Sequence, residues 1–228
     1  MKNQKQVQKI YKSQRSNDIN MLPGDPKGSP DESFFSETLV FIDANFLSKL
    51  SNYFGRGKYL IYDLVELSER LCKKQGLLCK QIFYYTAPPF QSEKATKEEE
   101  KRKYGYDRFL DKLRKKEVIV REGRCQRLKI NGKFEYRQKG VDILMAMDLM
   151  GIIPKSPKIK KIILIASDSD FVPVIENLKE NGTKTILYTY YEKKRDTNFS
   201  RSNHLIKSVY KYVLLSREDF DKSPLNKK

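Results

Sequence analysis

The sequence of 228 residues contains no tryptophan, one histidine and three cysteines. The single histidine, His204, disfavours both a histidine-rich metal centre and a Ser-His-Asp triad. The cysteines are spaced too widely for a zinc motif or a disulfide framework. No signal peptide is visible, and no apolar run approaches the roughly 20 residues that a membrane-spanning helix needs. These absences predict a soluble, cytoplasmic protein without a membrane segment, whose thiols are buried or idle.

Acidic residues are also few relative to basic ones. The chain has 46 Lys and Arg against 29 Asp and Glu, which gives a formal net charge of +17. This excess favours a polyanionic partner, because phosphate contacts from Lys and Arg release counterions and so drive binding. Charge that serves only solubility is the alternative, since net charge alone does not identify a site. A nucleic acid is therefore the expected class of partner.

Both ends of the chain have the composition of unfolded segments. Residues 1–33 are polar and basic, with clustered Pro and Gly near residues 23–30, which predicts a disordered N-terminal arm. Residues 217–228 are predicted to form a C-terminal tail. Residues 34–216 contain clear apolar runs, and their length is typical of a single folded domain.

Within that domain, apolar strands alternate with helical patterns. The strands are predicted at 38–43, 80–86, 117–121, 161–167, 183–189 and 210–215, and the helices at 59–74, 94–116, 141–152 and 170–181. Asn131-Gly132 is the favoured pair for a type I′ turn, so a hairpin is expected around it. The alternation predicts an α/β fold with parallel strands. In such sheets, ligands bind outside the carboxyl ends of the strands.

Three aspartates follow strands at that edge. Asp43 ends the first predicted strand, and Asp168 and Asp170 follow the strand at 161–167. Each also begins a helix, so helix capping is the alternative explanation for any one of them. Capping explains the group less well, because clustered carboxylates repel one another unless a cation neutralises them.

The segment from Val141 to Met150 provides a fourth carboxylate. It is apolar almost all round, which predicts a buried helix. Asp142 in its first turn must then be paired or bind a metal. Asp148 lies six positions later, roughly 120° away around the helix, so it cannot readily face the same site. We expect Asp148 to pair with an arginine, a lysine or a backbone donor instead.

Ligands that are all oxygen select hard cations, here Mg²⁺ or Mn²⁺. A carboxylate-bound metal beside a basic surface indicates phosphodiester hydrolysis, in which the metal activates water and neutralises charge on the phosphate. Asp168-Ser169-Asp170 also fits the nucleophile motif of haloacid-dehalogenase-like phosphatases. That family places its motif early and needs more strands after it than this chain has.

Three segments resemble the signature motifs of the NYN domain, a branch of the PIN-like nucleases, and are most similar to its LabA-like group. They are residues 41–45 (FIDAN), 139–142 (KGVD) and 166–171 (ASDSDF). The resemblance implies a three-layer α/β/α sandwich around a mostly parallel sheet, and Mg²⁺- or Mn²⁺-dependent endoribonuclease activity on RNA. It implies that the catalytic and metal-binding residues are Asp43, Asp142, Asp168 and Asp170. Asn45, Ser167 and Asp148 are expected to support them.

Basic residues around these motifs are candidates for contacts to the RNA backbone. They are Lys129, Lys133, Arg137, Lys139 and Arg195. For the hairpin residues, an ordinary solvated strand face is the alternative. Many LabA-like proteins have an aspartate near the end of the domain where this chain has Tyr210. An RNA-binding module with little or no cleavage activity is therefore the second functional hypothesis, and a homodimer is compatible with either.

Overall fold

The computed structural model describes residues 36–192 and 199–225, so the predicted N-terminal arm lies outside the described residues. A six-stranded parallel sheet forms its centre, in the order β3-β2-β1-β6-β7-β8. The strands are β1 (Ser36–Asp43), β2 (Leu77–Thr86), β3 (Ile119–Glu122), β6 (Lys161–Ile165), β7 (Lys184–Thr189) and β8 (Lys211–Leu214). The predicted α/β fold with a parallel sheet is confirmed.

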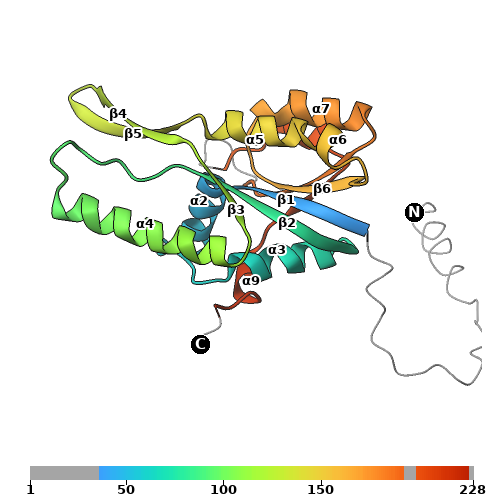
Figure 1. Ribbon diagram of the computed structural model, residues 1–228, viewed down its shortest axis with the longest axis horizontal. Helices are drawn as coiled ribbons and strands as arrows, with labels where there is room; N and C mark the ends of the chain where they lie inside the picture. Colours follow the sequence, from blue (N-terminus) through green and yellow to red (C-terminus); the bar gives the residue numbers. More distant parts are fainter. Residues whose placement is uncertain (1–35, 193–198, 226–228) are drawn as a thin grey trace, which may run out of the picture. The chain divides into compact units, whose positions relative to one another are not determined.

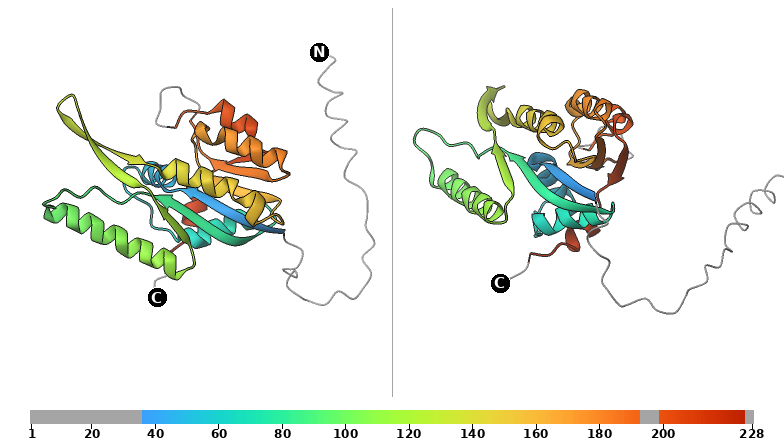
Figure 2. Two further views of the ribbon diagram at one scale, coloured as in Figure 1. Left: turned by 45° about the horizontal axis from the view of Figure 1, so that its top comes forward. Right: turned by 45° about the vertical axis from the view of Figure 1, so that its right-hand side comes forward.

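Helices cover both faces of this sheet, which gives the three layers that the family resemblance implied (Figures 1 and 2). On one face lie α2 (Ala44–Phe54), α3 (Leu64–Lys73), α4 (Lys97–Lys115) and α9 (Arg217–Asp221). On the other lie α5 (Val141–Met150), α6 (Ile152–Lys155), the 3-10 turn η2 (Ser169–Phe171), α7 (Val172–Glu180) and α8 (Asn203–Ser208). In the described chain, no helix is long and apolar enough to cross a membrane.

The two apolar cores explain why the strands read as continuous hydrophobic runs. In β1, Val40 and Ile42 pack toward α2 and α3, whereas Leu39 and Phe41 pack toward α5 and α7. A strand covered on both faces needs apolar side chains at every position, as parallel sheets usually do. The four side chains are at most 6% exposed.

Three sequence predictions need correction. Residues 59–63 are not helical, because Asp63 accepts hydrogen bonds from the backbone of Val65 and Glu66 and so caps α3 at its start. The helix that Asp43 was expected to begin is present as α2, which follows β1 directly. Residues 217–221 of the predicted tail form α9, whose Phe220 is buried. Helix α5 is not buried all round, because an exposed stripe runs along it, formed by Ile143, Met147 and Met150.

An antiparallel hairpin of β4 (Arg124–Ile130) and β5 (Lys133–Lys139) projects from the domain between β3 and α5 (Figure 1). Asn131 and Gly132 both have positive φ, of 49° and 77°, which is the expected type I′ turn. Gly123 joins the hairpin to β3, and its amide donates to the Thr86 carbonyl at 2.9 Å. The base of the hairpin is thus fixed to the edge of the sheet.

Gly123 is a position where one methyl group should be costly. A Cβ there would lie 2.5 Å from the backbone oxygen of Lys139, closer than real contacts allow. We expect Gly123→Ala to lower the free energy of unfolding by about 1–3 kcal/mol, as measured by urea denaturation. Gly105→Ala is the matched control, because nothing lies within 4 Å of a Cβ at that helical glycine. That control should gain about 0.5–1 kcal/mol, and equal changes in both variants would contradict the prediction.

Candidate acidic site

The sheet order creates a switch point between β1 and β6. From β1 the chain continues into α2 on one face, and from β6 it continues into α7 on the other. Ligands of open α/β sheets bind at the carboxyl ends of such neighbouring strands. Asp43 ends β1 there, and Asp168 follows β6.

A cavity of about 520 Å³ opens at this switch point. Asp43, Asp142 and Asp168 all line it, and they come from three separate segments of the chain. The remaining lining residues come from α2, the loop after β2, the hairpin and the start of α5: Asn45, Lys49, Ala87, Pro88, Pro89, Cys125, Tyr136, Arg137, Gln138 and Val141. Asp170 does not line the cavity and is exposed beside it.

Asp43 is the most enclosed of the carboxylates, at 9% exposure. Its Oδ1 atom accepts hydrogen bonds from the backbone amides of Asn45 (2.9 Å) and Phe46 (3.2 Å). Burial raises the pKa of Asp43 to about 6, and the negative charge of Asp142 adds to the rise, against the lowering effect of the two amide bonds and of Lys49. Loss of solvent thus outweighs helix capping, and Asp43 carries an unfavourable charge at neutral pH.

Asp142 lies in the first turn of α5. This helix begins directly after Gly140, which has a φ of +79°. Its side chain is exposed, so the prediction that a buried helix encloses it is wrong. Partial desolvation nevertheless raises the pKa of Asp142, and the charges of Asp168 and then Asp170 raise it further. The four predicted aspartates therefore act on one another electrostatically, although burial of α5 is not the reason.

Helix capping and site formation are not alternatives for these residues. Asp168 accepts a hydrogen bond from the backbone amide of Asp170 (2.9 Å) through Oδ1, as Asp43 does at α2. In the part of the chain that the structure describes, the Oδ2 atoms of Asp43 and Asp168 accept no hydrogen bond. Each carboxylate thus caps a helix with one oxygen and leaves the second one available to a ligand.

The carboxylates suit a hard cation in their chemistry, but they are not drawn together around one. Among the described residues, no three acidic, histidine or cysteine side chains are close enough to hold a metal ion. The donors that face the cavity are carboxylate and amide oxygens, which Mg²⁺ and Mn²⁺ prefer. The raised pKa values of Asp43 and Asp142 show that negative charge there is not fully compensated. The residues therefore fit a divalent cation by type and charge.

The basic candidates lie at different distances from the cavity. Arg137 lines it and also pairs with Glu135 at 3.0 Å. Lys139 is exposed at the base of β5, whereas Lys129 and Lys133 are exposed beside the turn at the tip of the hairpin. The tip is several residues from Arg137, at roughly 3.3 Å per residue, so its lysines do not reach the cavity. Arg195 lies outside the described residues.

Lys49 is a cavity residue that the sequence analysis missed. It lies on α2 and its charge lowers the pKa of Asp43. Asn45 and Lys49 are four positions apart, so they share one face of the helix. Because a helix was expected to begin at Asp43, this spacing was the signal that could have revealed Lys49.

Comparison with known protein families identifies the family of this chain. The sequence profile of the NYN domain family matches residues 37–213. The chain belongs to this family. The NYN family lies within the PIN-like nuclease superfamily, so the resemblance noted from the three motifs is confirmed.

The fold of this NYN domain also occurs in a solved structure. A protein of unknown function from Vibrio parahaemolyticus superposes with a TM-score of 0.52, at 16% sequence identity, over 81% of this chain and 96% of its own. Identity this low supports the fold alone. A search among curated proteins found no match.

Tyr210 lies away from the acidic cavity. The amide of Tyr210 donates to the carbonyl of Thr185, at the start of β7, and Lys184 lies over its ring. Tyr210 is therefore at the amino-terminal edge of the sheet, opposite Asp43 and Asp168. The inference that Tyr210 replaces a carboxylate of the cluster is wrong, because an aspartate there would face the other edge.

Proposed function

We propose that this NYN domain is a Mg²⁺- or Mn²⁺-dependent endoribonuclease that hydrolyses RNA phosphodiester bonds at Asp43, Asp142, Asp168 and Asp170. The observation that carries the proposal is the cavity at the switch point, where three aspartates converge from separate elements. Membership of a nuclease superfamily and the net charge of +17 support it. Placement in the LabA-like group remains a prediction.

When bound, the metal would lower the pKa of a water molecule and neutralise charge on the phosphate. The chain supplies the rest of the site. Asp43, Asp142 and Asp168 offer the oxygens that would hold the ion, and Asp170 adds negative charge beside them. Asn45 can donate a hydrogen bond to a phosphate oxygen, and Lys49 and Arg137 carry positive charge at the cavity wall.

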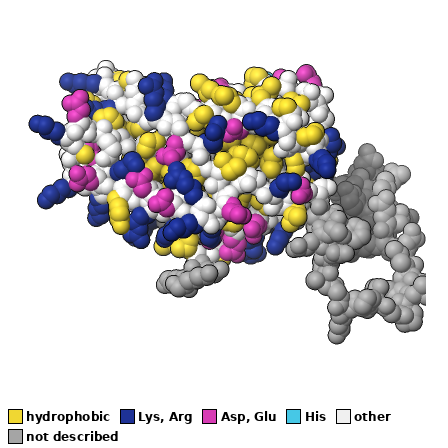
Figure 3. Space-filling model, in the orientation of Figure 1, with side chains coloured by type: hydrophobic (Ala, Val, Ile, Leu, Met, Phe, Trp, Pro, Cys, Tyr) yellow, Lys and Arg dark blue, Asp and Glu magenta, His cyan; other side chains and the backbone are white. Residues whose placement is uncertain are grey.

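The hairpin supplies a track for the RNA backbone outside the cavity. Glu135 is the sole acidic residue among its two strands, whose basic residues are Arg124, Arg127, Lys129, Lys133, Arg137 and Lys139. Lys and Arg side chains also gather over the half of the domain that holds α4 and the hairpin, with acidic side chains among them (Figure 3). This surface would bind phosphates without regard to base sequence.

Cleavage of single-stranded RNA tests the proposal. We expect products with Mn²⁺ or Mg²⁺, none with EDTA, and a loss of roughly 100-fold or more in kcat/KM for Asp168→Asn. Asp111→Asn is the matched control, because Asp111 is an exposed α4 carboxylate far along the chain from the motifs. Cleavage that survives EDTA, or that Asp168→Asn leaves intact, would overturn the proposal. Binding without any cleavage would favour the RNA-binding module.

A further inference from the structure

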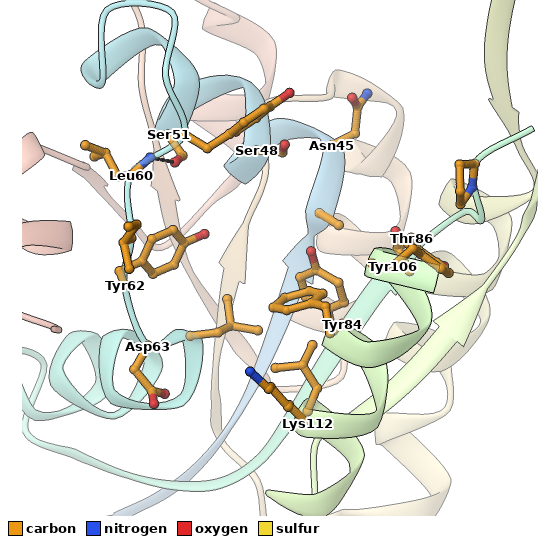
Figure 4. A pocket seen from close by; sticks show the side chains of 18 of the residues that line it. Asn45, Ser48, Ser51, Leu60, Tyr62, Asp63, Tyr84, Thr86, Tyr106 and Lys112 are labelled. Carbon is orange, nitrogen blue, oxygen red and sulfur yellow. Dashed lines mark hydrogen bonds between the residues drawn. The ribbon is translucent and has the colours of Figure 1, made fainter. Parts of the chain in front are cut away.

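A larger cavity, of about 1050 Å³, adjoins the acidic one and has no part in the mechanism above. It lies between α2, α4 and residues 59–63, over the end of β2 (Figure 4). The two cavities share four wall residues: Asn45, Ala87, Pro89 and Gln138. A ligand that fills the larger cavity could therefore extend into the acidic one.

Aromatic rings dominate this larger cavity, which we call the tyrosine pocket. Tyr62, Tyr84 and Tyr106 all line it (Figure 4). Burial raises the pKa of Tyr84, and the charge of Asp43 adds to the rise, so Tyr84 links the pocket to the acidic site. Among the described residues, Tyr62 and Tyr84 are half-buried, and their hydroxyls make no hydrogen bond. Two polar groups are thus free to meet a ligand.

A glycine keeps the pocket open. Gly105 lines it from within α4, where glycine destabilises a helix by roughly 0.5–1 kcal/mol relative to alanine. No atom lies within 4 Å of where its Cβ would be, so packing does not require glycine. A Cβ at this pocket-lining position would lie in open space, so we expect a larger side chain there to reduce the volume of the pocket.

Positive charge lies along the same helix. Arg102 and Lys112 line the pocket, and neither forms an ion pair with any residue that the structure describes. Lys116, one turn further, is by contrast paired with Asp63. Aromatic rings that can stack on bases, next to unpaired cations, are what single-stranded nucleic-acid sites combine.

We propose that the tyrosine pocket binds an unstacked base of single-stranded RNA, with Arg102 and Lys112 near its phosphates, and so positions the neighbouring phosphodiester at the acidic cavity. The inference rests on the proposed ribonuclease function and specifies its substrate as unpaired RNA. The volume of the tyrosine pocket suits a nucleotide, since ligand pockets commonly span roughly 300–1000 Å³. A base held within a duplex stack could not enter.

The test measures binding of a seven-nucleotide, fluorescein-labelled single-stranded RNA in EDTA, by fluorescence anisotropy. Tyr59→Ser removes an exposed ring from the pocket wall, and Tyr104→Ser removes a similarly exposed ring of α4 outside it; the two are 68% and 64% exposed. We expect Tyr59→Ser to bind the RNA at least fivefold more weakly than wild type, because stacking contributes about 1–3 kcal/mol per base. Tyr104→Ser should bind it as tightly as wild type. Gly105→Leu should weaken binding at least tenfold.

The same RNA annealed to its complement should bind wild type and Gly105→Leu equally. If wild type cleaves RNA but both pocket variants bind and cleave as it does, the pocket inference is overturned and the ribonuclease proposal stands. If wild type binds without cleaving and Gly105→Leu loses that binding, the pocket inference stands and the ribonuclease proposal fails. If wild type neither binds nor cleaves the RNA, both are overturned.

Discussion

Asp43→Asn is expected to lower RNA cleavage by roughly 100- to 1000-fold while making the folded protein more stable. The two effects have one cause. Burial and the charge of Asp142 raise the pKa of Asp43 from 3.8 to about 6, so its ionised form is unfavourable in the fold. The ionised Asp43 that a cation would bind therefore destabilises the folded protein when no cation is bound.

The sign of the pH dependence follows from that shift. Between pH 3.8 and about 6 the folded protein binds the proton of Asp43 more tightly than the unfolded chain does. The stability of the wild type contributed by this group is thus present below pH 4 and is lost as pH rises to about 6. This rise in the pKa of Asp43 corresponds to about 3 kcal/mol in the free energy of unfolding. Asparagine caps a helix about as well as aspartate, so α2 should tolerate the change.

Urea denaturation in EDTA at several pH values measures the effect. The stability gained by Asp43→Asn should be near zero at pH 4 and should rise to at most about 3 kcal/mol by pH 7. Asp111→Asn, at an exposed surface pair, should show no such rise. Mn²⁺ should stabilise wild type more than Asp43→Asn, because a cation that binds only the folded state stabilises it. A variant that is less stable than wild type at pH 7 would contradict this account of the site.

The sequence predicted the fold well because local signals and topology agreed. Parallel strands buried on both faces, such as β1 and β6, are continuous apolar runs and are hard to mistake. The strand-end rule then placed Asp43 and Asp168 at one edge without any structural information. Helix α9 was missed because only a few residues, chiefly Phe220, fix it to the domain.

Other features depend on packing that no local pattern encodes. Helix α5 is apolar all round in sequence, yet Ile143 and Met147 are more than half exposed, because no element covers that side. The tyrosine pocket is formed by Tyr62, Tyr84 and Tyr106, which come from three elements widely separated along the chain. Only the tertiary arrangement brings these three residues around one cavity. Tyr210 was expected near the acidic cluster but lies at the opposite edge of the sheet, because sequence order does not show which edge a residue occupies.

The prediction that Asp148 pairs with a basic residue is confirmed, and it leads to a second large expected effect. Asp148 on α5 pairs with Arg121 of β3 at 2.9 Å and accepts a hydrogen bond from Tyr85 of β2 at 3.0 Å. These contacts hold α5 against the edge of the sheet. Asp142 lies at the beginning of the same helix, so we expect Asp148 to act as a positioning residue for the acidic site.

Asp148→Ala is expected to lower the free energy of unfolding by about 2–3 kcal/mol, since it leaves Arg121 without its partner. Breaking a fully buried pair costs about 3–5 kcal/mol, and the effect here is smaller because the Arg121 side chain is 39% exposed. Below the melting temperature, kcat should fall roughly 10- to 100-fold, because small misplacements of catalytic groups are costly. KM for RNA should change little, since the basic surface is intact.

Tyr85→Phe separates this positioning effect from a general loss of stability. It removes one hydrogen bond to Asp148 and retains the ion pair with Arg121. Its expected cost is about 1 kcal/mol, with kcat close to that of wild type. Urea denaturation and single-turnover cleavage of the same RNA would compare the two variants. If folded Asp148→Ala cleaves as fast as wild type, the Asp148 contacts do not position Asp142, and the apolar contacts of Val141, Met145 and Leu149 are sufficient to hold α5 in place.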